Sequence, residues 1–402
     1  MGLVVEVQFF NTFILRSETV STIYAEESRI KGGFNEPFVN IGPKAHLHDE
    51  NYAETRRNNA LIYSGIYNSK TDINRTNVFS SAEAITRAVD PTNGGIQKLY
   101  AEDTNLNILQ EDKVSYALID KDALFTAEGG QLTASGAKVI GQIVPYLGKY
   151  GCQNPESFAI KGMRKYFADK NRGAILRLSR DGITEISAAG MKDYFKDNLK
   201  NSNKIVGMYD DYADEYVVSL QRSGINDTLV YDEMSKGWVS FYDYVPDFGF
   251  SLNKDFYTIN EGNIWKQYSN ADFNTFYGTA FASTVKIIAN AQPNMVKNFN
   301  AINYEGDNKW SMFSATTDLG QSAYAVLAND VTIAGDIVPK FVPKENKYYS
   351  HIMNNDAGTG SGQVVGIQQA GIKGFVNIVQ LSNGATEEVE LFNVGHEVVQ
   401  SS

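Results

Sequence analysis

The stretches NLNILQEDKVSYALIDKDALFTA (residues 105–127) and MRKYFADKNRGAILRLSRDGITEIS (residues 163–187) follow one plan. Each passes from a short apolar run through a turn with Asp into an Ala-Leu or Ala-Ile-Leu run, and then reaches Asp-Ala-Leu or Asp-Gly-Ile. Looser copies occur at residues 215–242 and 255–268, at irregular spacing. A repeated unit of antiparallel strands buries its faces against its neighbours, so the pattern predicts a mainly β, propeller-like or solenoid array. Such arrays usually serve as scaffolds and binding surfaces.

The composition agrees with a β-rich globular chain. The 402 residues are 43% hydrophobic and 21% charged, and 23 Tyr, 22 Phe and 34 Gly favour strands and tight turns over helices. The net charge of −11 opposes adhesion to a phosphate backbone. It is compatible with DNA that passes through a repulsive channel.

The single cysteine, Cys152, excludes an intramolecular disulfide and a cysteine metal cluster, and it fits maturation in a reducing cytoplasm. No run of about 18 apolar residues occurs, so no membrane helix is expected. The first 16 residues are expected to form strands and not a signal peptide.

The chain divides into three predicted segments. Residues 1–95 hold N-terminal strands at 3–10 and 19–24 and then a polar, Asn-rich connecting arm, whose residues 81–90 form a short helix capped by Ser81. Residues 96–277 form the propeller-like β body, interrupted by a helix over residues 188–201. Residues 278–402 form closing blades or a small C-terminal β domain. Their predicted strands are 285–289, 309–314, 347–352 and 374–381.

Several motifs resemble the nozzle, or muzzle, proteins of short-tailed bacteriophage tails, in particular those of crAss-like phages. The clearest are GCQNPESF (151–158), KYFAD (165–169), GAILRLS (173–179), DGITEIS (181–187) and GM (190–191). Residues 24–34, 99–114, 216–241 and 344–352 also resemble that group. The resemblance implies a propeller-rich structural protein that forms a ring, of six subunits, around the DNA exit channel. Members are usually longer, so the chain is expected to be a fragment or a short variant. The family has no catalytic residues to transfer.

Two clusters of polar residues have the chemistry of metal or catalytic sites. His46 and His48 would place two imidazoles on one face of a strand, as a zinc site needs, but the surrounding sequence lacks strand alternation and an exposed polar loop is favoured. Asp210, Asp211, Asp214 and Glu215 form the densest acidic cluster. Calcium binding and glycosidase acid–base chemistry both use paired carboxylates. The spacing lacks the Gly and final Glu of a calcium loop, so a turn before a strand is favoured, with a structural cation left open.

A basic stretch interleaved with Tyr166 and Phe167 suggests contact with nucleic acid. It comprises Lys161, Arg164, Lys165, Lys170, Arg172, Arg177 and Arg180. Asp169 and Asp181 make its charge mixed, so we favour a solvated blade face or salt bridges to a neighbouring subunit.

Aromatic groups near the later repeats suggest either a carbohydrate platform or packing between blades, and packing is the simpler interpretation. The groups are Trp238/Phe241/Tyr242, Phe256/Tyr257 and Trp265/Tyr268.

The sequence therefore predicts a virion structural protein, a nozzle subunit made in the host cytoplasm that contacts other tail proteins such as the hub and lets genomic DNA pass. No catalytic, cofactor-binding or metal-binding residue is assigned and no cofactor is expected, because serine-hydrolase, phosphate-loop and dinucleotide motifs are missing and Cys152 has no nearby His. The alternatives are a receptor-binding propeller that holds a host-surface glycan and a propeller glycan hydrolase that uses the residue 210–215 cluster.

Overall fold

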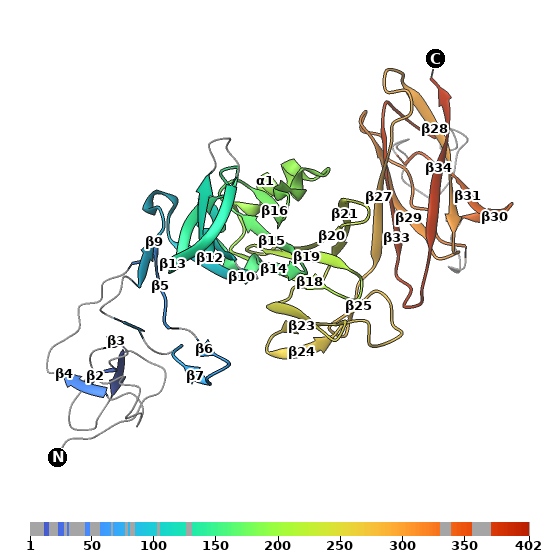
Figure 1. Ribbon diagram of the computed structural model, residues 1–402. Helices are drawn as coiled ribbons and strands as arrows, with labels where there is room; N and C mark the ends of the chain where they lie inside the picture. Colours follow the sequence, from blue (N-terminus) through green and yellow to red (C-terminus); the bar gives the residue numbers. More distant parts are fainter. Residues whose placement is uncertain are drawn as a thin grey trace. The chain divides into compact units, whose positions relative to one another are not determined.

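The computed structural model describes residues 12–15, 23–27, 30–31, 45–48, 57–65, 67–76, 79–80, 85–102, 105–125, 131–329, 339–355 and 371–401 (Figure 1). These residues are mainly β-strands in antiparallel sheets, which confirms the predicted mainly β class. One pair, β3 (Ile30–Lys31) with β8 (Phe79–Ser80), is parallel. The chain has two compact units, Met1–Asp255 and Phe256–Ser402.

Three four-stranded sheets follow one another in the first unit, and in each the strand order is the chain order. The first contains β10 (Ile96–Glu102), β11 (Asn105–Gln110), β12 (Val114–Phe125) and β13 (Gln131–Pro145). The second contains β14 (Ala159–Lys161), β15 (Arg164–Asp169), β16 (Ala174–Ser179) and β17 (Gly182–Glu185). The third contains β18 (Lys204–Asp210), β19 (Glu215–Gln221), β20 (Asn226–Asp232) and β21 (Gly237–Tyr242), and β22 (Phe248–Leu252) follows it.

The sequence repeat occupies the same place in each sheet. Its first two runs are the second and third strands, namely β11 and β12, β15 and β16, and β19 and β20. Both are inner strands with a partner on each side, so they are rich in buried apolar residues. The predicted strand–turn–strand phrase is therefore confirmed.

Two glycines mark close approaches in the first unit. A Cβ at Gly151 would lie 1.9 Å from the carbonyl oxygen of Glu111, in the turn between β11 and β12. A Cβ at Gly207 on β18 would lie 1.9 Å from the carbonyl oxygen of Ser157, in the short 3-10 helix η2 (Pro155–Ser157). Only a residue without a side chain fits at these points.

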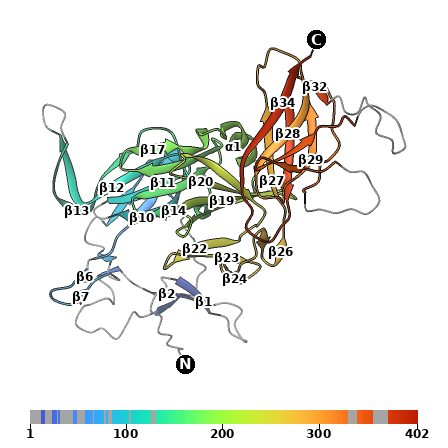
Figure 2. The same ribbon diagram turned by 90° about the vertical axis from the view of Figure 1, so that its right-hand side faces the viewer.

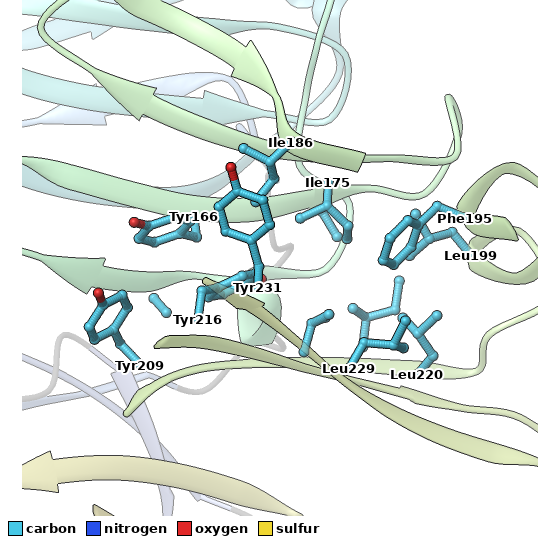
Figure 3. Close-up of a cluster of buried hydrophobic side chains, with 14 residues drawn as sticks. Tyr166, Ile175, Ile186, Phe195, Leu199, Tyr209, Tyr216, Leu220, Leu229 and Tyr231 are labelled. Carbon is cyan, nitrogen blue, oxygen red and sulfur yellow. The ribbon is translucent and has the colours of Figure 1, made fainter. Parts of the chain in front are cut away.

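The core between the second and third sheets contains rings and aliphatic side chains from both (Figure 3). The helix α1 (Lys192–Leu199) contributes Phe195 and Leu199 to this core. The predicted helix over residues 188–201 is thus confirmed but is shorter at both ends. Gly190, with φ of 78°, separates it from the 3-10 helix η3 (Ile186–Ala188).

The predicted polar arm contains short paired strands instead of lacking them. These are β4 (Ala45–His48), β5 (Ala60–Ile62), β6 (Tyr67–Asn68), β7 (Ile73–Asn74), β8 and β9 (Thr86–Ala88). The helix predicted over residues 81–90 is wrong where it is described, because β9 pairs with β5 and the 3-10 helix η1 (Pro91–Asn93) follows. Leu61 and Val89 are buried in the core of the first sheet, and this packing outweighs weak helix propensity.

Of the predicted N-terminal strands, residues 3–10 lie outside the described residues. The end of the 19–24 strand falls in β2 (Ile23–Glu27), which pairs with β1 (Thr12–Leu15) and β4.

The second unit begins with the hairpins β23 (Asp255–Asn260)–β24 (Asn263–Lys266) and β25 (Thr275–Phe276)–β26 (Thr279–Ala280). Two sheets then share one apolar core that includes Phe299, Tyr304, Met312 and Leu381. One sheet is β27 (Ser283–Ala289), β33 (Asn377–Asn383) and β29 (Ser311–Thr317). The other is β30 (Val342–Lys344), β31 (Lys347–His351), β28 (Lys297–Gly306) and β32 (Ile372–Gly374), with β34 (Leu391–Gln400) also on β28. The four strands predicted here correspond to β27, β29, β31 and β33.

Candidate functional site

A stack of tyrosines and a buried carboxylate join the second sheet to the third. The ring of Tyr166 on β15 stacks on Tyr216 of β19, with centroids 4.6 Å apart (Figure 3). The Tyr166 hydroxyl donates to Glu233 Oε1 at 2.7 Å, and Arg177 Nη1 donates to Glu233 Oε2 at 2.8 Å. Burial raises the pKa of Tyr166, so the hydroxyl keeps its proton and remains a donor. The arrangement holds two sheets together and leaves no free nucleophile or base.

Most side chains of the predicted basic stretch form ion pairs or hydrogen bonds within the chain. Lys165, 3% exposed, pairs with Glu102 of the first sheet, and Lys161 pairs with Asp211 at 2.7 Å. Arg172 lies 3.6 Å from Asp169. Arg164 lies 3.8 Å from Glu233, and Lys170 Nζ donates to the Ser202 carbonyl at 2.7 Å. Apart from the Arg172–Asp169 pair, which lies in the turn between β15 and β16, these contacts link the second sheet to its neighbours in the same chain. Arg180 differs, because its guanidinium has no partner among the described residues.

The acidic cluster is the turn between β18 and β19. Asp210 is buried, and its Oδ1 accepts the backbone N–H groups of Tyr212 and Ala213 at 2.8 and 3.2 Å. Asp214 has a φ of 61° and accepts the Tyr209 hydroxyl at 3.0 Å. The cluster thus has the geometry of a turn. The turn holds its first carboxylate in the interior.

A row of three carboxylates crosses the third sheet at this end. Glu215 on β19 lies opposite Asp210 on β18 and opposite Asp232 on β20. Burial, Asp210 and Asp232 raise the pKa of Glu215 to about 7. Asp232 accepts the backbone N–H groups of Met234 and Ser235, and these bonds lower its pKa. Burial and the two neighbouring carboxylates therefore favour the protonated form of Glu215 near neutral pH.

The histidines do not assemble into a site in the described part of the chain. His46 and His48 lie in β4 and not in the loop that we expected, because β4 pairs with β2. His396 is largely buried with its ring edge-on to Phe299, and burial lowers its pKa. No group of three or more His, Cys, Asp or Glu suited to a metal occurs in the ranges that the structure describes.

Cys152 is fully buried, and burial raises the pKa of its thiol to about 12. A neutral thiol is a poor nucleophile, so this residue acts as packing.

The aromatic groups also act mainly as packing. Trp238 lies 4.5 Å from Phe195 and 5.4 Å from Tyr231 between ring centroids, and its indole N–H donates to the Ile186 carbonyl. Phe256 is buried, and Trp265 lies 5.3 Å from Tyr277. Trp238 and Phe256 thus form packing contacts. Phe241 and Tyr268 from the same groups are 55% and 51% exposed.

A cleft of about 840 Å³ lies between the first and second sheets. The Lys165–Glu102 pair and Tyr116 line it, and the ring centroid of Tyr116 is 5.1 Å from that of Tyr146. The Tyr146 hydroxyl donates to Asn107 Oδ1 at 3.0 Å, and burial raises the pKa of Tyr146 to about 12. The volume is within the range of ligand pockets.

The lining of the cleft is mixed, with exposed apolar side chains beside charged ones. Leu147 is 94% exposed and Met163 is 38% exposed, and Arg180 lies with them in the lining. Sequence reasoning missed this site, since it joins residues from two repeats. The available signal was an apolar Pro145-Tyr146-Leu147 run placed in a turn before Gly148.

In the described part of the chain, no helix is long and apolar enough to cross a membrane.

Comparison with known proteins finds two matching family models and one curated relative. A family model described as "Crassvirus muzzle protein" matches residues 49–262, and a model of the "Crassvirus muzzle protein C-terminal domain" matches residues 271–355. A curated relative, the "Muzzle protein" of Bacteroides phage crAss001, is 23% identical over 207 residues. That match covers 50% of this chain and 14% of the relative, so the chain spans a small part of the relative's length.

Proposed function

The chain belongs to the crassvirus muzzle protein family, and from this premise we propose that it is a virion structural protein, a subunit of the tail nozzle, or muzzle, around the DNA exit channel. The observation that carries the proposal is the pair of family models that match residues 49–262 and 271–355. The proposal gives the chain no catalytic role and no cofactor.

The arrangement of the first unit supports a scaffold. Three antiparallel sheets whose strand order follows the chain are typical of propeller blades, and we extend the proposal to propeller-like packing of β10–β13, β14–β17 and β18–β21. Their ion pairs and rings connect each sheet to the next. Sheets connected in this way favour a static structural role over a conformational change.

Each of the three proposed segments would have its own structural role. Residues 1–95 would form N-terminal strands and an arm that reaches a neighbour, residues 96–277 the propeller-like body, and residues 278–402 the closing blades or a small β domain. The subunits would form a ring, of six by family resemblance, that touches other tail proteins such as the hub. The net charge of −11 supports a lumen from which genomic DNA is repelled.

Electron microscopy tests the proposal directly. The full chain is purified alone and together with the tail-hub protein of its phage, with the hub alone as control, and antibody labelling locates the chain on virions. We expect rings, particularly with the hub, and label at the tail. Label absent from the virion, together with binding of the chain to host-surface glycan, contradicts the proposal and favours a separate receptor-binding module.

Light scattering at micromolar concentration tests assembly of the isolated chain. We expect a species larger than a monomer. A sharp monomer peak with residues 41–95 protected from a protease contradicts the assembly of the isolated chain.

A further inference from the structure

The cleft of about 840 Å³ lies between the first sheet, which contains β12, and the second sheet, which contains β17 (Figure 2). The first sheet lines it with Tyr116 on β12 and Val144 on β13, and the second lines it with Lys165 on β15 and Ile183 on β17. Contacts that only hold two sheets together fill the space between them, because protein interiors are packed without large voids. A cleft of this size at such a junction has room for a ligand.

The charges that line the cleft balance one another. Lys165 pairs with Glu102. Arg180 lies in the lining together with Asp181, whose carboxylate also accepts the Ser179 hydroxyl. A lining with equal numbers of positive and negative groups does not attract a phosphate, a nucleic acid or a strongly charged peptide. The occupant that suits this cleft is therefore a neutral molecule.

Several hydrogen-bonding groups of the lining are available to such a molecule. Lys165 and the side-chain amide of Asn107 both donate to Oε2 of Glu102, which leaves Oε1 as an acceptor. The Tyr116 hydroxyl and the Asn105 side-chain amide form no hydrogen bond with any residue that the structure describes. Together they offer both donors and acceptors. The hydroxyl groups of a sugar, which donate and accept, match this mixture.

Apolar surface lies beside these polar groups. The exposed side chains of Leu147 and Met163 belong to the lining, as do the half-buried rings of Tyr116 and Tyr146. A sugar ring carries C–H groups on its faces and hydroxyl groups around its rim, so it packs on aromatic or aliphatic side chains while it forms hydrogen bonds. A neutral sugar therefore uses both parts of the lining.

We propose that the cleft between the first and second sheets binds a short neutral oligosaccharide. Tyr116 and the exposed apolar side chains contact the faces of the sugar rings, while Glu102 Oε1, the Asn105 amide and the Arg180 guanidinium bond its hydroxyl groups. One sugar ring fills only part of the cleft, so affinity rises with the number of linked rings. The inference goes beyond the proposed structural role, and a nozzle subunit in the virion can carry this site.

Isothermal titration calorimetry on the full chain tests the site. The probes are four neutral hexasaccharides, namely maltohexaose, cellohexaose, mannohexaose and chitohexaose. The comparisons are the monosaccharide of each and hexagalacturonic acid, an anionic chain of the same length. We expect at least one neutral hexasaccharide to bind, with a dissociation constant at least about tenfold below those of its monosaccharide and of hexagalacturonic acid. No binding by any of the four, or equal binding of the anionic chain, overturns the proposal.

Substitutions at the surface of the cleft locate the bound sugar. Arg180→Ala and Asn105→Ala should each raise the dissociation constant about tenfold, because a sugar hydroxyl loses its partner. Lys200→Ala is the control, since Lys200 is exposed and lies outside the cleft. Circular dichroism checks the fold of each variant. Affinities equal to wild type in both cleft variants place the sugar elsewhere and overturn the proposal.

Sedimentation velocity of the same variants examines the rival occupant, a second copy of the chain. Self-association that Arg180→Ala and Asn105→Ala both weaken, in a chain that binds none of the four hexasaccharides, assigns the cleft to a subunit contact and overturns the sugar site. Self-association that is unchanged in variants with weakened sugar binding supports the site. Absence of the chain from virions contradicts the proposed function instead and leaves the binding result as it is.

Discussion

Tyr166 on β15 and Tyr216 on β19 stack with their rings 4.6 Å apart and 13° from parallel, although 50 positions of chain that include a helix separate them in the sequence. Both rings are fully buried, and the Tyr166 hydroxyl reaches Glu233 in the turn that follows β20. One side chain thus connects the second sheet to β19 and to the turn after β20 in the third sheet.

Removing the Tyr166 hydroxyl should destabilise the first unit. Tyr166→Phe keeps the stack but leaves the buried Glu233 carboxylate with one donor fewer, which costs about 1–2 kcal/mol. Tyr166→Ala also removes the ring and costs about 3–5 kcal/mol. Urea unfolding measures both, with Tyr324→Phe at a 38% exposed site as the control. Equal stability of Tyr166→Phe and wild type would contradict a role for the hydrogen bond.

Gly207→Ala should destabilise the contact between β18 and the segment before the second sheet. The new methyl group would lie 1.9 Å from the Ser157 carbonyl oxygen, so backbone has to shift, at a cost of about 3 kcal/mol. Gly237→Ala in β21 is the matched control, because its nearest neighbour atom is 3.8 Å away. Thermal unfolding compares the two, and an unchanged midpoint for Gly207→Ala would show that β18 does not pack this closely.

Stability of the first unit should fall as the pH rises towards 7. The pKa of Glu215 is about 7 in the folded chain against a reference value of 4.5, so the folded state binds more protons between these values. Stability contributed by this proton is therefore present at low pH and lost as pH rises through the folded pKa. Glu215→Gln removes the like-charge row with Asp210 and Asp232.

The Glu215→Gln variant should exceed wild type in stability above pH 7 by about 1–2 kcal/mol, less than the full shift because the carboxylate is partly hydrated. The advantage should vanish near pH 4. Urea unfolding at several pH values measures it, and Glu388→Gln at an exposed site serves as control. A constant difference between variant and wild type at every pH would refute the assigned titration.

Asp210→Asn combined with Asp211→Asn should weaken the β18–β19 turn without removing any activity. The amide that replaces the Asp210 carboxylate keeps an oxygen for the two backbone N–H groups, while the loss of the Asp211–Lys161 pair costs about 0–1 kcal/mol at this half-exposed site. Calorimetric titration with calcium should show no binding to wild type or variant. Calcium held with oxygen ligands at about 2.3–2.6 Å would restore the metal-site hypothesis.

The local sequence pattern predicted the strands of the repeat well, but it predicted the secondary structure of the N-terminal arm less well. The repeated phrase identifies β11, β12, β15, β16, β19 and β20, because each inner strand shows its own apolar run and turn residues. The pattern of residues 81–90 favours a helix because Ala and Glu are good helix formers, yet β9 forms there when Val89 enters a core built from distant residues. The strand at His46 and His48 likewise depends on its partner β2 and not on alternation.

The sequence by itself determined the β class, the places of the repeats, the helix at Phe195 and the resemblance to phage muzzle proteins, since these depend on neighbouring residues and on motifs. Only the tertiary structure decided which basic side chains form ion pairs. The basic stretch appears free in the sequence, but Lys161, Lys165 and Arg177 meet carboxylates from other sheets, while Arg180 meets none among the described residues. The cleft beside Arg180 and the shifted pKa of Glu215 have the same origin. Both arise where separate strands converge, and distances between strands are set by packing and not by order along the chain.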